Sequence, residues 1–342
     1  MARSSTITII AKRIVAAIPS VIGVIIITFL LTRALPGDPA AYFAGPAATQ
    51  EAIDQIRETL GLDRPLPVQF LIYIGELLRG DLGTSLTTGQ TVVSDLTTRL
   101  PASLELTLAG LLFSLTLALP LGILAATRPN SWIDHGVRVL ATAGVSLPTF
   151  FTGLLLVYVF YFRLGIAPAP LGRLDILVSS PEPVTGLYLI DSLLEGQWET
   201  FTAALSQLVL PAITLGLFAL APLARVTRAA MLAVLSSDFI RTARASGLSP
   251  FTILFGYAFR NALLPIVTTL GVVFSFLLGA NVLVEKVFAW PGIGSYAVSA
   301  LVASDYAAVQ GFVLTMALLY VVLNLLIDLL YAVIDPRAGV DS

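Results

Sequence analysis

The sequence predicts an all-α, polytopic membrane protein with six transmembrane helices. Hydrophobic residues make up 57% of its 342 residues and charged residues only 12%, and the mean hydropathy is +0.91. Soluble domains carry about 25% charged residues, so this chain cannot cover itself with an ordinary aqueous surface. The apolar residues also gather in runs long enough to cross a bilayer as helices. Membrane lipid is therefore its first expected partner.

The composition also excludes several kinds of site. The chain has no cysteine, which rules out disulfides and thiolate metal sites, and its single histidine, His135, has no second imidazole with which to share a metal. A net charge of −2 argues against nucleic-acid binding. No phosphate-binding loop, nucleophile elbow or zinc-protease motif is present. We expect no cofactor and no metal, and any energy from a nucleotide must come from another chain.

The first predicted span is the apolar run from Ile14 to Leu31, which follows three basic residues. At a rise of 1.5 Å per residue this run extends about 27 Å, enough for a hydrocarbon core of roughly 30 Å. The apolar region of a cleaved signal peptide is usually shorter, about 7–15 residues. The sequence therefore favours an uncleaved first span over a signal peptide.

Five further spans follow from hydropathy. They are Ala102–Ala126, Val137–Phe162, Ser206–Ala224, Asn261–Leu283 and Val309–Ala332. Prolines in or beside them are expected to kink helices, which is common in membrane bundles and can also shape a pathway. These prolines are Pro120, Pro148, Pro211, Pro222 and Pro265.

Six spans place both chain ends on one side of the membrane, and charge indicates which side. The segments on the side of the termini are 1–13, 127–138, 225–260 and 333–342, and they hold 11 of the 19 Lys and Arg residues. The opposite segments are almost twice as long in total and hold only 8. Because basic residues concentrate in cytoplasmic loops, both termini are expected in the cytoplasm.

The expected organisation has four parts: a first span with its cytoplasmic end (1–33), an outer segment (34–101), a five-helix core (102–332) and a cytoplasmic tail (333–342). In the outer segment we expect a surface helix capped by Thr49, a second helix over Val68–Leu78, and an interfacial helix over Val92–Leu100 that ends before Pro101. A second outer segment, 163–205, has no assignable element. Both outer segments either act as a lid on the outer mouth or receive a solute-carrying partner.

The core contains a polar hairpin, within residues 225–260, between two long apolar runs. Ser237 or Asp238 can cap a short helix, Gly247 suits the left-handed residue that follows it, and Ser249-Pro250 can start the next helix.

Two interpretations of that short helix remain open. Arg241 and Arg244 lie three residues apart on one face, while Ala243, Ala245 and Gly247 leave little bulk for an approaching protein. This favours a docking element. The alternative is an ordinary cytoplasmic loop whose arginines follow the positive-inside rule.

The last span carries a polar stripe, because Tyr320, Asn324 and Asp328 recur every four residues. Such residues must face protein or water inside a membrane. A hydrogen-bonded seam between helices is favoured over contact with substrate, since Asp328 lies only about one turn from the cytoplasmic end.

The hairpin resembles a known family. Asp238-Phe-Ile-Arg-Thr-Ala-Arg-Ala-Ser-Gly-Leu248, with Arg260-Asn-Ala-Leu-Leu-Pro265, is similar to the cytoplasmic loop of binding-protein-dependent ABC importer permeases of the dipeptide, oligopeptide and nickel subgroup. Further stretches resemble the first permease of that subgroup: Pro36-Gly-Asp-Pro39, Leu60-Gly-Leu-Asp-Arg-Pro65, Arg79-Gly-Asp-Leu-Gly83, Arg99-Leu-Pro101, Pro120-Leu-Gly122, Val145-Ser-Leu-Pro148, Phe288-Ala-Trp-Pro-Gly292 and Asp335-Pro-Arg337. The sequence differs from the broader family pattern at Arg241, where a glutamate is usual.

The resemblance implies a type I ABC importer permease fold and a non-catalytic subunit that takes up di- or oligopeptides, or alternatively a nickel chelate or glutathione. Its implied partners are a second homologous permease, two ATP-binding ATPase subunits and an extracytoplasmic solute-binding protein. The residues that would couple to the ATPases are Asp238, Arg241, Thr242, Ala243, Arg244, Gly247 and Leu248.

Two other classes fit less well. An ion-coupled secondary transporter normally needs ionisable groups near mid-membrane, and the spans offer only Glu105, Arg138, Asp328 and charges at their edges. A membrane-embedded hydrolase would need a nucleophile beside a base, and His135 lies in a short loop between spans.

Overall fold

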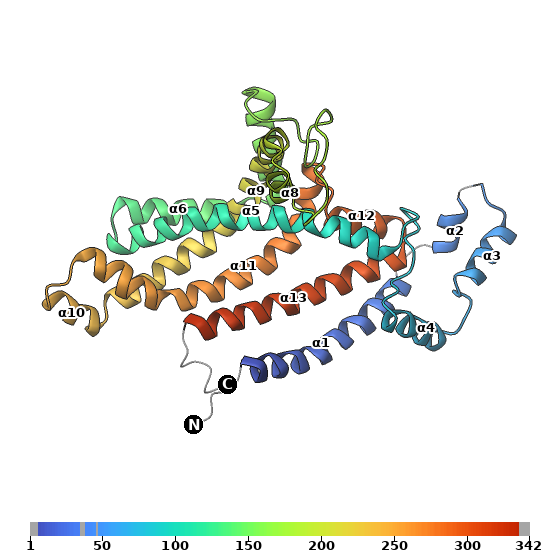
Figure 1. Cartoon of the computed structure of the whole chain (residues 1–342), viewed down its shortest axis with the longest axis horizontal. Coiled ribbons are helices and arrows are strands. Elements are labelled where there is room, and N and C mark those ends of the chain that lie inside the picture. The colour runs from blue at the N-terminus through green and yellow to red at the C-terminus, as the bar shows by residue number, and fades with distance from the viewer. Residues whose placement is uncertain (1–5, 35–37, 46, 335–342) are drawn as a thin grey trace. The chain divides into compact units, whose positions relative to one another are not determined.

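The computed structural model describes residues 6–34, 38–45 and 47–334, which form helices joined by loops (Figure 1). Strand-like pairing within those ranges is limited to one isolated bridge between Thr84 and Thr91. This confirms the all-α class. The chain divides into two compact units, one of Met1–Pro101 with Gly292–Val322 and one of Ala102–Pro291 with Leu323–Ser342.

The first unit contains one long apolar helix and several short ones. Its complete helices are α1 (Thr6–Ala34), α2 (Pro39–Ala44), α3 (Gln50–Thr59), α4 (Leu66–Leu78) and α12 (Ile293–Val302). Parts of two long helices, α5 (Val92–Thr127) and α13 (Tyr306–Ile334), complete it. Its core joins the start of α5 to α12 and the start of α13 through Val92, Leu96, Ile293, Tyr296, Ala300 and Ala308.

Two short helices of the first unit match the sequence expectations. The Thr49 hydroxyl accepts a hydrogen bond from the Ala52 amide at 3.4 Å, so Thr49 caps α3 as predicted. Leu66 begins α4, one turn after the break at Gly61, whose φ of +64° lies in the left-handed region that glycine tolerates.

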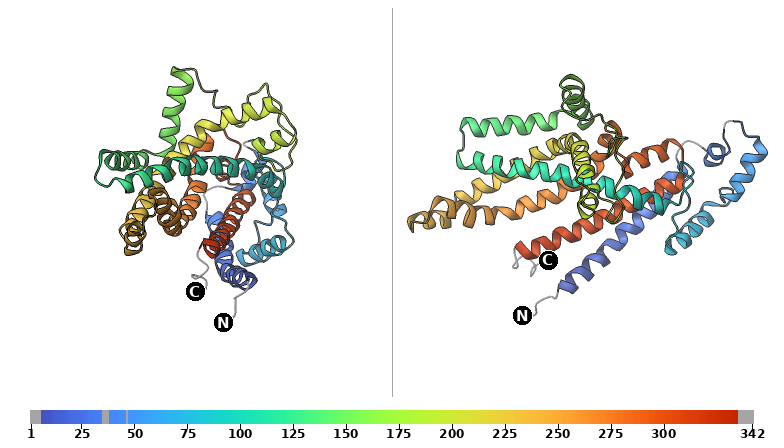
Figure 2. Two further views of the ribbon diagram at one scale, coloured as in Figure 1. Left: turned by 60° about the vertical axis from the view of Figure 1, so that its left-hand side comes forward. Right: turned by 45° about the horizontal axis from the view of Figure 1, so that its top comes forward.

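The second unit holds the remaining helices. They are α6 (Trp132–Ser146), α7 (Thr149–Leu156), the π-helical η1 (Val157–Arg163), α8 (Tyr188–Leu194), α9 (Trp198–Leu235), α10 (Asp238–Ala245), the π-helical η2 (Thr252–Phe259) and α11 (Arg260–Val287). Figures 1 and 2 show α9 and α11 side by side. Helices α5 and α9 approach closely because Gly216 and Gly110 lack side chains: a Cβ at Gly216 would lie 2.7 Å from the Gly110 carbonyl oxygen.

Four helices in the described part of the chain are long and apolar enough to cross a membrane. They are Val92–Thr127, Trp198–Leu235, Thr252–Val287 and Tyr306–Ile327. These contain or overlap four of the predicted spans. The other two fall on shorter apolar helices, Ile18–Ala34 and Thr149–Arg163. The number of six transmembrane helices stays a prediction.

Two prolines behave differently from expectation. Val137–Phe162 is not a single helix, because Leu147 is extended (φ −104°, ψ 138°) and separates α6 from α7. The ring of Pro148 disfavours the helical conformation at the preceding residue, so the chain breaks there instead of kinking. At Pro101 the predicted helix boundary is wrong, because α5 runs through this residue without interruption. A proline removes only its own amide hydrogen bond, and long flanking helical stretches can tolerate that loss.

Candidate coupling site

The polar hairpin forms the short, separately terminated helix α10. Its last turn closes as a Schellman motif, in which the Leu248 amide donates to the Ala243 carbonyl (3.3 Å) and the Gly247 amide to the Arg244 carbonyl (3.1 Å). Gly247 has a φ of +76°, as this motif requires. At the other end Ser237 occupies the cap position, but its hydroxyl donates to the Val234 carbonyl at 2.6 Å instead of accepting from α10.

Helix α10 has one buried and one exposed face. Ile240 is fully buried and Ala243 is 7% exposed. They pack in an apolar cluster with Ile123, Ala126, Met231, Ile253, Ala258, Ala262 and Ile266. The small side chain of Ala243 therefore lets α10 approach its own unit closely. The expectation that Ala243 makes room for another protein is wrong, because its face of the helix is already covered.

The remaining predicted coupling residues lie on the exposed face. Asp238 and Arg241 form an ion pair at 2.6 Å, and the Thr242 hydroxyl donates to the Asp238 carbonyl at 3.1 Å. Arg244 and Leu248 are exposed and line a cavity of about 640 Å³. Other walls of the cavity come from the end of α5, the end of α9 and the start of η2, at Ala126, Pro129, Leu232, Leu235, Pro250 and Ile253.

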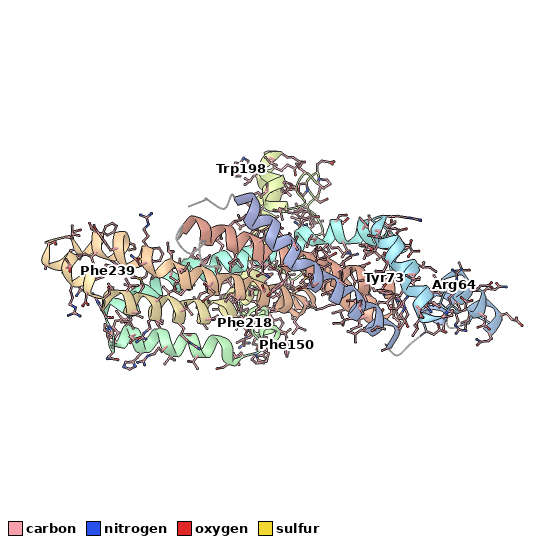
Figure 3. The ribbon with its side chains drawn as sticks, turned by 90° about the horizontal axis from the view of Figure 1, so that it is seen from below. Arg64, Tyr73, Phe150, Trp198, Phe218 and Phe239 are labelled. Atoms are coloured by element: carbon pink, nitrogen blue, oxygen red, sulfur yellow. The ribbon has the colours of Figure 1, made fainter. Side chains whose placement is uncertain are left out.

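Large aromatic side chains flank the polar face. Phe239 is 45% exposed and Phe251 is 71% exposed. Figure 3 shows Phe239 at the hairpin, well away from Trp198 at the start of α9. Exposed aromatic residues beside arginines are typical of protein interfaces. The exposed face of α10 therefore has the residue composition of a docking surface.

A charged link holds α6 to α9 near the hairpin. The buried carboxylate of Asp134 accepts two hydrogen bonds from the Arg228 guanidinium, at 2.5 and 2.7 Å, and one from the Asn130 amide at 3.0 Å. These donors, with Arg228 the largest influence, lower the pKa of Asp134 to about 2. Sequence reasoning missed this pair because its members lie 94 residues apart.

A second polar group, here called the Glu105 cluster, comprises Ser103, Glu105, Arg173, Asn281 and Glu285. Arg173 donates to Glu105 at 2.7 Å and to the Gly186 carbonyl at 2.8 Å, and the Leu189 amide also donates to Glu105. The Ser103 hydroxyl donates to Glu285 at 2.5 Å, and Asn281 donates to the Ser103 carbonyl. All five residues are buried.

The Glu105 cluster fixes the second outer segment onto α5, and α5 onto α11. The Arg173 guanidinium also lies 3.4 Å from the centre of the Tyr188 ring. In the sequence, Glu105 stood out only as an ionisable residue within a predicted span, and nothing indicated its partners. An acidic residue at the start of an apolar run, with a lone arginine in a polar loop, was the only available signal.

The predicted polar stripe of the last span is only partly described. Tyr320 is 54% exposed and Asn324 is exposed. Neither makes a side-chain hydrogen bond to another described residue, so a seam within this chain is not seen for these two positions. The side chain of Asp328 lies outside the described residues. The part of the chain described also contains no group of three or more His, Asp or Glu side chains arranged to hold a metal ion.

Comparison with known proteins decides the family. The model of binding-protein-dependent transport system inner membrane components matches residues 118–340, and the model of the N-terminal part of such components matches residues 6–107. The chain belongs to this family. It is therefore the inner-membrane permease component of an ABC importer, a non-catalytic subunit that works with an ATPase and a solute-binding protein.

Individual relatives of the permease agree with this assignment. The probable D,D-dipeptide transport system permease protein DdpB of Escherichia coli (strain K12) is 49% identical over 93% of the chain and 94% of that protein. The di/tripeptide transport system permease protein DppB of Pseudomonas aeruginosa (strain UCBPP-PA14) is 44% identical over 96% and 97%. The inward-facing MetNI methionine ABC transporter matches with a TM-score of 0.50 and 19% identity over 68% of the chain and 93% of the matched chain. This last match supports the fold alone.

Proposed function

We propose that the permease takes up di- or oligopeptides delivered by an extracytoplasmic solute-binding protein. In this proposal it pairs with a second homologous permease, and two ATP-binding ATPase subunits drive the pair. Support for peptides comes from relatives whose names specify dipeptide or di/tripeptide transport and which match almost the whole chain. The exposed Tyr320 and Asn324 are a suitable face for the second permease, because polar side chains on a membrane helix need protein or water beside them.

The observation that carries the coupling role is the construction of α10. Its apolar face is anchored in its own unit through Ile240 and Ala243, and its polar face is left free. Asp238, Arg241, Thr242, Arg244, Gly247 and Leu248 would meet the ATPase. Movement of the ATPase would then act on α10 and, through the anchor, on α5, α9 and α11, opening and closing the pathway.

Substitutions at Gly247 test this role. A Cβ at Gly247 would meet no atom within 4 Å, so a larger side chain would project into open space where the ATPase would dock. Gly247→Ala and Gly247→Trp share the same backbone strain, about 1–2 kcal/mol for a left-handed residue. We expect Gly247→Trp to uncouple ATP hydrolysis from peptide uptake, and Gly247→Ala to stay close to wild type. If both variants reached the membrane and took up peptide equally well, the proposed docking of the ATPase at Gly247 would be contradicted.

The proposed orientation places both termini and the hairpin in the cytoplasm, with the segments 34–101 and 163–205 outside. The chain has no native cysteine, so single cysteines report position without background. An impermeant maleimide should label Leu177→Cys, whose parent residue is 93% exposed, in intact cells. Arg244→Cys should react only after the cells are permeabilised. Labelling of Arg244→Cys in intact cells would contradict the orientation and the coupling role together.

The substrate class needs a separate measurement. Mass spectrometry of the solute retained by the cognate binding protein should find short peptides. A retained nickel chelate or glutathione would overturn the peptide assignment and leave the coupling role unaffected.

A further inference from the structure

The first unit contains a cavity of about 370 Å³ at the C-terminal end of α1, to which the proposed transport mechanism assigns no role. It is lined by α1, α4, the loops around them and the start of α13. Its walls include two arginines, three carboxylates and two tyrosines, namely Arg33, Arg64, Glu76, Asp81, Asp305, Tyr73 and Tyr306. Figure 3 labels Tyr73 and Arg64 in this unit. The volume lies within the range of small-ligand sites, roughly 300–1,000 Å³.

Arg33 is one of the two arginines that line this cavity, and its hydrogen-bond partners among the described residues are both uncharged. Its Nε donates to Gln69 Oε1 and its Nη1 to Thr32 Oγ1, both at 3.3 Å. Among the described residues no carboxylate lies within ion-pair distance of the guanidinium, and Nη2 has no hydrogen-bond partner. A partly buried guanidinium is costly without a counter-ion, and its open fork matches the oxygens of a carboxylate or a phosphate.

The guanidinium is held in position by its surroundings. It lies 4.2 Å from the centre of the Phe29 ring and 5.3 Å from that of Tyr306. Gln69, which accepts from Arg33, donates in turn to the carbonyls of Leu62 and Arg64. These contacts leave the free Nη2 fixed in direction, which lowers the entropic cost of capturing an anion.

The surface that leads to the cavity is apolar. Leu30 and Leu31, the residues of α1 just before it, are 53% and 61% exposed. On α4, Leu71 is 70% exposed, and Ile72 is both 37% exposed and part of the cavity wall. Acyl chains can cover such side chains, and an arginine at the end of a membrane helix lies at the depth of lipid phosphates.

We propose that this cavity binds the headgroup of a phospholipid, with the phosphate at Arg33 and the acyl chains along the exposed apolar side chains of α1 and α4. Glu76, Asp81 and Asp305 line the same cavity and would repel a headgroup that carried only negative charge. The site therefore suits a zwitterionic headgroup such as phosphoethanolamine, whose ammonium complements these carboxylates. The inference rests on the proposed membrane placement of α1 and is independent of the substrate and of the coupling role.

The test is native mass spectrometry of the full chain, purified with its partner subunits in mild detergent and supplied with phosphatidylethanolamine. Collision energy is raised until bound lipid leaves. Arg33→Gln should lose one lipid at lower energy, with retention about tenfold weaker, because a charge-assisted contact is removed. Arg79→Gln is the matched control, since Arg79 is an exposed arginine at the end of α4 outside this cavity, and it should retain lipid as the wild type does.

Further arms distinguish the lipid from other anions. Phosphatidylglycerol should be retained less well than phosphatidylethanolamine, and Arg33→Lys should fall between wild type and Arg33→Gln because it keeps the charge and loses the fork. Equal retention by the wild type and Arg33→Gln would overturn the proposal. So would displacement of the lipid by millimolar dipeptide or inorganic phosphate in an Arg33-dependent manner, since the cavity would then take a small soluble anion.

Discussion

Two attachments in the second unit can be compared directly. At the hairpin, α10 is held by the apolar side chains of Ile240 and Ala243, and its charged residues pair only with each other or point outward. At the second outer segment, attachment depends on the buried ion pair of Glu105 and Arg173, with hydrogen bonds to two backbone groups. The apolar contact at the hairpin has no preferred direction, whereas the ion pair at the second outer segment requires a defined orientation of both side chains.

This difference indicates how each region moves. Apolar packing depends on area and tolerates small rotations, so α10 can tilt with a docked partner while it stays attached. A buried ion pair is stable only in a narrow geometry, because each desolvated charge needs its partners. The second outer segment should therefore behave as a preformed surface, and the hairpin as a hinged contact.

The largest expected effect comes from breaking the Glu105 pair on one side. Arg173→Met leaves the Glu105 carboxylate buried without its counter-ion, which should cost about 3–5 kcal/mol. The loss should appear as a lower thermal midpoint and faster proteolysis between residues 163 and 197. The double variant Glu105→Gln with Arg173→Met should recover most of the stability. A double variant as unstable as the single one would show that the segment is held by something else.

Removing the apolar anchor of the hairpin should have a smaller, local effect. Ile240→Ala deletes a fully buried side chain and should cost about 2 kcal/mol, the low end for such changes, because α10 lies at the edge of its unit and can partly collapse. Hydrogen exchange should accelerate in α10 and stay unchanged in the middle of α9. Phe239→Ala, at a position 45% exposed on the same helix, is the control and should leave exchange unaltered. Faster exchange throughout α9 would show that the hairpin is not a separate element.

The same contrast explains what the sequence could and could not predict. The ends of α10 depend on neighbours within a few residues, so Ser237 and Asp238 at one end and Gly247 at the other were sufficient to place them. Glu105 and Arg173 lie 68 residues apart, and nothing local to either one indicates the other.

Prolines show the same limit. Pro101 and Pro148 have the same intrinsic preferences, yet α5 continues through the first and α6 ends before the second. Whether a helix continues depends on what the packing around it stabilises, and tertiary packing is not readable from a single chain.

The effect of acid separates the base of the hairpin from α10, because it acts through Asp134. Its pKa is lowered to about 2 by Arg228 and the Asn130 amide, against about 3.9 for an unfolded aspartate. A carboxyl with a lowered native pKa stabilises the fold above its unfolded pKa and loses that contribution as the pH falls through the native value. The contribution of Asp134 to the thermal midpoint should therefore stay constant near neutral pH and be lost between about pH 4 and pH 2. Asp134→Asn should lose that part of the fall, because no carboxylate remains to titrate, whereas Asp238→Asn, at the exposed pair with Arg241, should follow the wild type. If Asp134→Asn kept the full acid dependence, the charged link between α6 and α9 would not contribute to stability, and apolar packing alone would hold both the hairpin and its base.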